Sequence, residues 1–180
     1  MERTYIKDLN GKTGETVSIS GWVSVRRDHG KLVFIDLRDA TGMVQMVALP
    51  NHTDAHARAN ECRPEWVLEV TGIVNKRPEK MVNAKEHNGA IELEVTGITV
   101  LNKSETPTID PTSDGRDIGE EARMQYRYID LKRARMQHNM RMRHEVVKLI
   151  RNWLSEKDFI EVETPILTKS TPEGARDYLV

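Results

Sequence analysis

The sequence contains a single cysteine and few aromatic residues, and it has no long apolar run. Because Cys62 is the only cysteine in 180 residues, no disulfide can form within the chain, and a reducing compartment is expected. No stretch is apolar enough to cross a bilayer, and residues 1–5 hold no signal core, so we expect a cytoplasmic protein without a membrane partner. Lys and Arg number 27 against 28 Asp and Glu, so overall charge does not indicate a nucleic-acid binder.

Several catalytic and metal-binding patterns are also missing. His52 and His56 lie four residues apart with Cys62 beyond them, but no further ligand cluster accompanies them, so no metal site is predicted. Residues 11–13 read Gly-Lys-Thr like the end of a phosphate loop, yet Ile6 stands where the first glycine belongs. The sequence offers no Ser-His-Asp or Cys-His arrangement for nucleophilic catalysis.

Residues 15–101 alternate between apolar and polar positions, which is typical of short strands. The expected elements are a strand through Val17–Val25 with Gly21 as a bend or bulge, strands over 31–38, 43–48, 66–74 and 91–101, and a helix within 51–62. Five strands with a helix between the third and fourth are the order of an OB-fold, a five-stranded Greek-key barrel that often binds oligonucleotides. Other small barrels share parts of this order.

Alternation in the second strand places one phenylalanine opposite the core. The residues expected to face the core are Val33, Ile35 and Leu37. Phe34 then faces outward, either to stack on a base or to pack beneath a loop. Gln45 and Glu92 also lie outside the core, where they either read base edges or serve as ordinary strand-surface polarity.

Beyond the strands, the chain changes to a linker and helices. Residues 106–118 are rich in Pro, Ser, Thr and Asp, and residues 120–135 are expected to form a short helix or hinge, with Met124, Tyr128 and Leu131 inward. From Asn139 a longer helix is predicted by one apolar stripe, composed of Met142, Val146, Leu149, Ile150, Trp153 and Leu154.

The last residues read as a strand followed by a polar loop. Phe159, Ile160 and Val162 favour a strand that ends at Pro165, and Glu173 lies in the loop beyond. Residues 157–180 resemble the first signature motif of class II aminoacyl-tRNA synthetases, continued by a Thr-Pro-Glu-Gly-Ala-Arg-Asp-Tyr run typical of aspartyl-tRNA synthetases. The segments 21–28, 34–39 and 126–133 resemble the same family, in the same order and at similar spacing.

The resemblance implies three regions and a set of functional residues. They are an anticodon-binding OB-fold at 1–105, a linker and hinge at 106–135, and the first helix and strand of an α+β class II catalytic domain at 136–180. By the same resemblance, the anticodon and tRNA contacts are Phe34, Gln45, Glu92, Arg26, Arg27, His29 and Arg77. Glu173 would bind the ammonium group of L-aspartate, and Pro165 would lie at the centre of a homodimer interface.

The implied activity is that of an aspartate–tRNA ligase, which uses ATP and Mg²⁺ to attach aspartate to tRNA(Asp). His29 stands where many bacterial members carry Leu, and members with His tend to charge tRNA(Asn) as well. Motifs 2 and 3 of the class do not occur in these 180 residues. We therefore expect an amino-terminal fragment that binds the anticodon, holds no cofactor and is inactive alone.

Three alternatives remain at this point. Asparaginyl- and lysyl-tRNA synthetases share the domain order, although the Gly174–Tyr178 run argues against the lysyl enzyme. A free-standing OB-fold protein that binds single-stranded nucleic acid would explain the barrel but not the motif at 157–180. A truncated paralogue that binds tRNA or dimerises is the third alternative.

Overall fold

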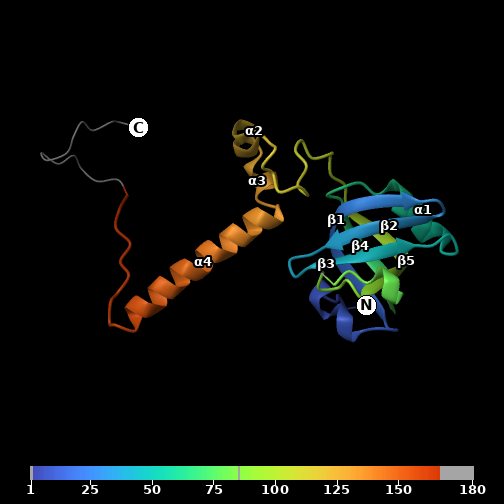
Figure 1. The fold of residues 1–180 in the computed structure, drawn as a ribbon, viewed down its shortest axis with the longest axis horizontal. Coiled ribbons are helices and arrows are strands. Elements are labelled where there is room, and N and C mark those ends of the chain that lie inside the picture. Colours follow the sequence, from blue (N-terminus) through green and yellow to red (C-terminus); the bar gives the residue numbers. More distant parts are fainter. Residues whose placement is uncertain (1, 85, 167–180) are drawn as a thin grey trace, which may run out of the picture.

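A barrel, a linker and a helical arm follow one another along the chain (Figure 1). The computed structural model describes residues 2–84 and 86–166. Within them, the strands are β1 (Thr16–His29), β2 (Leu32–Arg38), β3 (Met43–Ala48), β4 (Val67–Lys76) and β5 (Ile91–Asn102). They close in the order β1-β2-β3-β5-β4, with β3 and β5 parallel and the other neighbouring strands antiparallel. Helix α1 (Thr53–Glu61) lies between β3 and β4 in sequence, so the predicted OB-fold is confirmed.

The barrel is filled by one face of each strand, as period-two alternation requires. Buried side chains from the strands include Val17, Ile19, Val23, Val33, Ile35, Leu37, Val44, Met46, Leu68, Val70, Val74, Ile91, Leu93 and Val95. Two short elements extend this core. The 3₁₀ helix η1 (Ile6–Gly11) adds Ile6 and Leu9, and α1 adds Ala55 and Ala59.

The irregularity in β1 lies three residues later than expected. Pairing with β2 shifts register between Val23 and Val25, which leaves Ser24 as the extra residue of a bulge. Gly21 has a different purpose, because a Cβ there would lie 2.3 Å from the carbonyl oxygen of Arg38. The prediction of a bend or bulge at Gly21 was therefore wrong in position. Gly21 permits the close approach of β2, and the bulge lies at Ser24.

The region expected as one helix or hinge is divided into α2 (Glu120–Gln125) and α3 (Arg127–Asp130). The chain turns at Tyr126, where φ is −106° and ψ is 43°, so side chains on either side do not form one helical stripe. The predicted inward packing of Met124 and Tyr128 was wrong, because these side chains are 62% and 68% exposed. Leu131, the third residue expected inward, is only partly buried.

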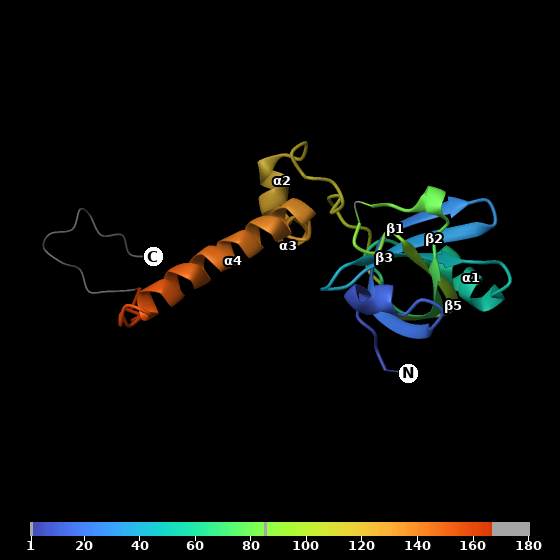
Figure 2. The same ribbon diagram turned by 60° about the horizontal axis from the view of Figure 1, so that its bottom comes forward.

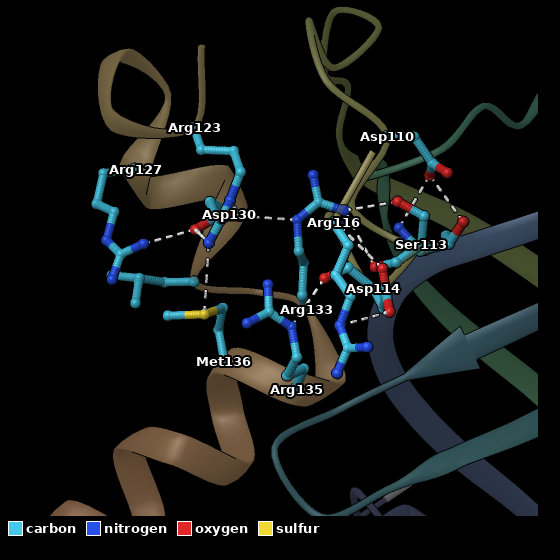
Figure 3. A network of polar contacts seen from close by, with 12 residues as sticks. Asp110, Ser113, Asp114, Arg116, Arg123, Arg127, Asp130, Arg133, Arg135 and Met136 are labelled. Carbon is cyan, nitrogen blue, oxygen red and sulfur yellow. Dashed lines mark hydrogen bonds and ion pairs between the residues drawn. The ribbon is translucent and has the colours of Figure 1, made fainter. Parts of the chain in front are cut away.

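A buried carboxylate holds the hinge together (Figure 3). Asp130 accepts hydrogen bonds from Arg123 Nε at 3.0 Å, Arg127 Nη1 at 2.6 Å and Arg133 Nε at 2.8 Å. Arg133 is itself fully buried and donates through Nη1 to the Ser113 carbonyl at 3.0 Å, which ties the linker to the helices. The hydrogen bond from Arg123, together with those neighbouring cations, lowers the pKa of Asp130 despite burial.

Helix α4 (Ala134–Ser155) begins earlier than the predicted Asn139 and points away from the barrel in both ribbon views (Figure 1, Figure 2). The predicted helix is present, but its apolar stripe is largely exposed: Leu149 is 68% and Trp153 56% accessible. Among the described residues, only the segment around Phe159 and Ile160 lies near it, beside Ile150 and Leu154.

The prediction of a strand after α4 was wrong for the described residues. Residues 159–165 have neither helical nor strand structure, and Ile160 is 86% exposed. A strand needs a neighbouring ladder for its backbone groups, and no described strand lies beside this segment. The segment is instead tied to α4 by three hydrogen bonds from Arg151 to Glu161: Nε donates to Oε1 at 3.0 Å and to Oε2 at 2.9 Å, and Nη2 donates to Oε1 at 2.9 Å.

Candidate nucleic-acid interface

A cavity of about 690 Å³ opens on the outer face of the barrel. Its walls come from the end of β1, from β2, β3 and β5, and from the segment that contains the 3₁₀ helix η2 (Glu79–Met81). The lining residues are Arg27, His29, Leu32, Phe34, Gln45, Val47, Leu49, Arg77, Pro78, Met81, Glu92 and Glu94. An apolar floor with a few charged groups is typical of a ligand site.

Six of the seven residues expected to contact the anticodon line this cavity, and one does not. The six are Arg27, His29, Phe34, Gln45, Arg77 and Glu92. Arg26 points elsewhere, because successive side chains of a strand face opposite sides. Its guanidinium donates to Asp28 Oδ1 at 2.7 Å and to Asn60 Oδ1 of α1 at 3.3 Å.

Phe34 lies in the cavity wall because β2 keeps the alternation that its sequence predicts. Its strand neighbours Val33 and Ile35 are buried, whereas Phe34 is only partly buried. The His29 ring forms a T-shaped contact with the Phe34 ring, with centroids 5.5 Å apart. Gln45 lies on the adjacent strand, where it pairs with Asp36. A partly exposed ring beside an amide provides a stacking surface and hydrogen-bonding groups in one wall.

Two carboxylates from β5 form another wall of the cavity. Glu92 and Glu94 are two residues apart, so both face outward while Leu93 enters the core. Glu94 accepts hydrogen bonds from His52 Nε2 at 3.2 Å and from Asn75 Nδ2 at 3.0 Å, which hold it in place. Sequence reasoning named Glu92 but missed Glu94, although the same two-residue alternation would have identified it.

Burial is the main electrostatic effect at Glu92. It raises the pKa of this carboxyl, and the nearby Glu94 adds to the rise while the Arg77 guanidinium opposes it. Arg77 Nε is buried and has no hydrogen-bond partner among the described residues. Arg27 is partly engaged, since its guanidinium lies 2.8 Å from the Asp36 carboxylate. The cavity is therefore lined by both cations and carboxylates, of which Arg27 is paired with Asp36 while Arg77 Nε has no partner among the described residues.

This arrangement suits one or a few unstacked bases. A base can stack on a partly exposed phenylalanine, with its edge hydrogen-bonded to the amide of Gln45 or the carboxylate of Glu92. Arg27 and Arg77 at the same cavity can contact backbone phosphates. The described part of the chain contains no group of three or more His, Cys, Asp or Glu placed to hold a metal ion.

The remaining predicted site residues lie at the other end of the chain. Pro165 is exposed and outside any helix or strand, and Glu173 lies outside the described residues. In the described ranges, none of the helices is both long enough and apolar enough to cross a membrane.

Comparison with protein families assigns both halves of the chain. Residues 17–101 match the OB-fold nucleic acid binding domain, and residues 119–180 match the family of class II tRNA synthetases for D, K and N. With a closed barrel ahead of the start of a catalytic domain, the chain belongs to the class II aminoacyl-tRNA synthetases.

Within that class, its homologues along the chain are aspartyl-tRNA synthetases. The chain is 50% identical to an aspartate–tRNA(Asp/Asn) ligase of Syntrophotalea carbinolica, over 93% of this chain and 28% of the relative. It is 48% identical to an aspartate–tRNA ligase of Oceanobacillus iheyensis, over 99% of this chain and 30% of the relative. The chain thus spans less than a third of these relatives' length.

A solved structure shares the fold of nearly all of this chain. The asparaginyl-tRNA synthetase of Pyrococcus horikoshii, complexed with asparaginyl-adenylate, superposes with a TM-score of 0.78 at 26% identity. The match covers 97% of this chain and 39% of that protein.

Proposed function

We propose that this chain is the anticodon-binding part of an aspartate–tRNA ligase, and that the barrel cavity receives anticodon bases. The observation that carries the proposal is the convergence of Phe34, Gln45 and Glu92 in one cavity from three different strands. Each supplies a separate element of single-strand recognition, namely a stacking surface, an amide and a carboxylate. Homology to aspartyl-tRNA synthetases supports the tRNA as the partner.

The whole protein would join L-aspartate to tRNA(Asp) through an aspartyl adenylate, with ATP as the other substrate, in the cytoplasm where translation occurs. Class II synthetases in general use ATP and Mg²⁺. The described residues contain no group of three or more His, Cys, Asp or Glu placed to hold a metal ion, and we assign these residues no step of the chemistry. Glu173 is proposed to bind the aspartate ammonium, and the α4 stripe with Pro165 to form a homodimer contact.

We further propose that both tRNA(Asp) and tRNA(Asn) are bound. His29 supports this because it lines the cavity beside Phe34, where it can contact the RNA. One of the compared relatives is named an aspartate–tRNA(Asp/Asn) ligase and the other an aspartate–tRNA ligase, so their names do not decide whether tRNA(Asn) is bound.

Fluorescence anisotropy with labelled anticodon stem-loops for Asp, Asn and Lys tests these proposals at one fixed salt concentration. We expect similar affinity for the Asp and Asn loops and weaker binding of the Lys loop. Phe34→Ala should weaken the Asp complex by about 1–3 kcal/mol, the value of one stacked base. The matched control is Trp22→Ala, which removes an exposed aromatic residue from β1 outside the cavity.

Equal binding of all three loops, unaffected by Phe34→Ala, would make the barrel a general single-strand binder. An Asp loop preferred over the Asn loop would retain the ligase assignment and reject dual specificity. ATP–pyrophosphate exchange with L-aspartate tests the catalytic part separately, and we expect no exchange from the 180-residue chain alone.

A further inference from the structure

Glu65 lies where the barrel meets the hinge, and its buried carboxylate binds one cation from each. Arg38 Nη2, at the end of β2, lies 2.8 Å from Glu65, and Lys132 Nζ, just after α3, lies 2.5 Å from it. The Glu65 side chain is only 6% exposed. Such a contact joins two parts of the chain that are 67 residues apart in sequence.

The backbone at Glu65 is held in an unusual conformation. Its φ is +68°, in the left-handed region that residues with a Cβ seldom adopt. Hydrogen bonds with β1 fix it there: the Glu65 amide donates to the Val23 carbonyl at 2.8 Å, and the Val23 amide donates to the Trp66 carbonyl at 2.9 Å. The carboxylate is therefore presented from a position that is rigid with respect to the barrel.

On the hinge side, Lys132 is attached to an equally rigid unit. It lies between Asp130 and Arg133, whose side chains are both fully buried in the cluster of Figure 3. Helix α4 begins at Ala134, two residues after Lys132. A change in the position of Lys132 would therefore move the hinge and the start of α4 together.

On the barrel side, Arg38 belongs to the strand that carries the proposed stacking residue. Phe34, Asp36 and Arg38 lie on the same face of β2, and Asp36 pairs with Arg27 of the cavity wall. The contact with Glu65 thus ties the hinge to the strand on which the candidate site is built.

The barrel strands share little packed surface with the helices beyond the linker. Among the described residues, no barrel strand packs broadly against α2, α3 or α4. Two hollows of about 300 and 170 Å³ both have Glu65 and Lys132 in their walls, so the space around the contact is incompletely filled. Where the surrounding surfaces do not interlock, a directional polar contact has the largest effect on how the hinge is held relative to the barrel.

We propose that Glu65 is a positioning residue: its contacts with Arg38 and Lys132 set the direction in which the hinge and α4 leave the barrel. In the complex with tRNA, this would align the body of the tRNA with the hinge once the anticodon occupies the cavity. That second statement rests on the function proposed above, whereas the first concerns this chain alone.

Pulsed EPR between spin labels at Thr16→Cys and Asn139→Cys, in a Cys62→Ala background, tests the first statement. We expect one narrow distance distribution for the parent chain. Lys132→Met should broaden or shift it, while Lys132→Arg restores it and the control Lys148→Met, on exposed α4, has no effect. Lys132→Met leaves Glu65 paired with Arg38, so the barrel should stay folded. An unchanged distribution in Lys132→Met would overturn the proposal.

Binding of two RNAs tests the second statement. Lys132→Met should leave the affinity for the Asp stem-loop unchanged and weaken whole tRNA(Asp) about fivefold or more, a usual size for coupling between sites. Equal losses for both RNAs, or no loss for either, would overturn the tRNA-aligning role. If the parent chain binds neither RNA, the proposed function fails, while the EPR result still decides whether Glu65 sets the hinge direction.

Discussion

The rings of His29 and Phe34 form a T-shaped pair, with centroids 5.5 Å apart and planes inclined at 83°. His29 ends β1 and pairs with Leu32, so the turn between β1 and β2 brings it over the strand that carries Phe34. An edge-to-face contact of this kind restrains the phenylalanine ring without covering both of its faces. His29 can therefore affect base stacking through Phe34 as well as through direct contact.

The first prediction follows from this contact. His29→Ala should weaken binding of the Asp stem-loop by about 0.5–1.5 kcal/mol, the usual value of an aromatic pair, and by less than Phe34→Ala. Anisotropy titration measures both variants, with His138→Ala on exposed α4 as the control. A loss as large as that of Phe34→Ala would instead indicate that His29 itself holds the RNA.

The second prediction concerns pH and Glu92. Burial raises the pKa of this carboxyl, so it takes up a proton at a higher pH than an exposed glutamate does. If the carboxylate accepts a hydrogen bond from a base, affinity for the stem-loop should fall as pH drops through that raised pKa. Glu92→Gln should remove this part of the pH dependence, whereas Glu69→Gln on the barrel surface should not. Identical pH profiles for the parent chain and Glu92→Gln would count against the carboxylate contact.

The third prediction concerns the linker glycine beside Arg133. Gly115 has φ +76°, and a Cβ there would lie 2.6 Å from Arg133 Nε, inside the buried cluster. Gly115→Ala should therefore destabilise the hinge by about 1–3 kcal/mol through strain and displacement of Arg133. Hydrogen exchange of the amides of α3 and early α4 measures the local effect. Gly119→Ala is the matched control, because nothing lies within 4 Å of its added Cβ.

The fourth prediction concerns acid stability. Burial alone would raise the pKa of Glu65, but hydrogen bonds from Arg38 and Lys132 outweigh it, so the pKa is lowered on folding. The ionised Glu65 carboxylate therefore contributes fully to the free energy of unfolding above the unfolded chain's pKa of about 4.3. This contribution is lost as the pH falls through the lower pKa of the folded chain. Glu65→Gln should cost about 1–3 kcal/mol near pH 7, the penalty for buried partners left without their carboxylate.

Urea unfolding of the parent chain and Glu65→Gln at several pH values provides the measurement. The two stabilities should converge as the pH falls below about 4.3, where the parent begins to lose this contribution. An exposed glutamate in η2, Glu79, serves as the control through Glu79→Gln. A constant difference between parent and Glu65→Gln at all pH values would show that shape, and not charge, explains the loss.

The fifth prediction concerns the single thiol. Burial is the main cause that raises the pKa of Cys62 to about 11, and its Sγ donates to the Arg58 carbonyl at 3.3 Å. At pH 8 only about a thousandth of the thiol would then be ionised, so reaction with a disulfide reagent should be very slow. Absorbance of the released thiolate measures the rate, and unfolding in urea should restore ordinary reactivity. Fast reaction of the native chain would contradict the buried position.

Much of the barrel could be predicted from local pattern. β3 has the predicted bounds, and the alternation that placed Val33, Ile35 and Leu37 in the core also placed Phe34 outward. Such alternation is read directly from sequence because successive side chains of a strand face opposite sides. The candidate site could be named only with the help of family resemblance, since Phe34, Gln45 and Glu92 are far apart in the chain.

The hinge could not be predicted in the same way. Met124 and Tyr128 looked inward on a continuous helix, but the break at Tyr126 exposes both and buries Ile129, Asp130 and Arg133. A buried arginine is favourable only where a specific carboxylate and carbonyls meet it, and that depends on the linker around Ser113. Periodicity contains no information about such partners.

The sequence by itself determined where the strands lie along the chain, the core face of the second strand and the apolar stripe of α4, because these depend on spacing within one element. The tertiary structure alone decided that Arg26 donates to Asn60 of α1, that His52 holds Glu94, and that Glu65 pairs with Lys132. Those relationships depend on where separate elements meet. Their physical reason is that burial, charge pairing and ring contact act through space, between residues that the chain order keeps apart.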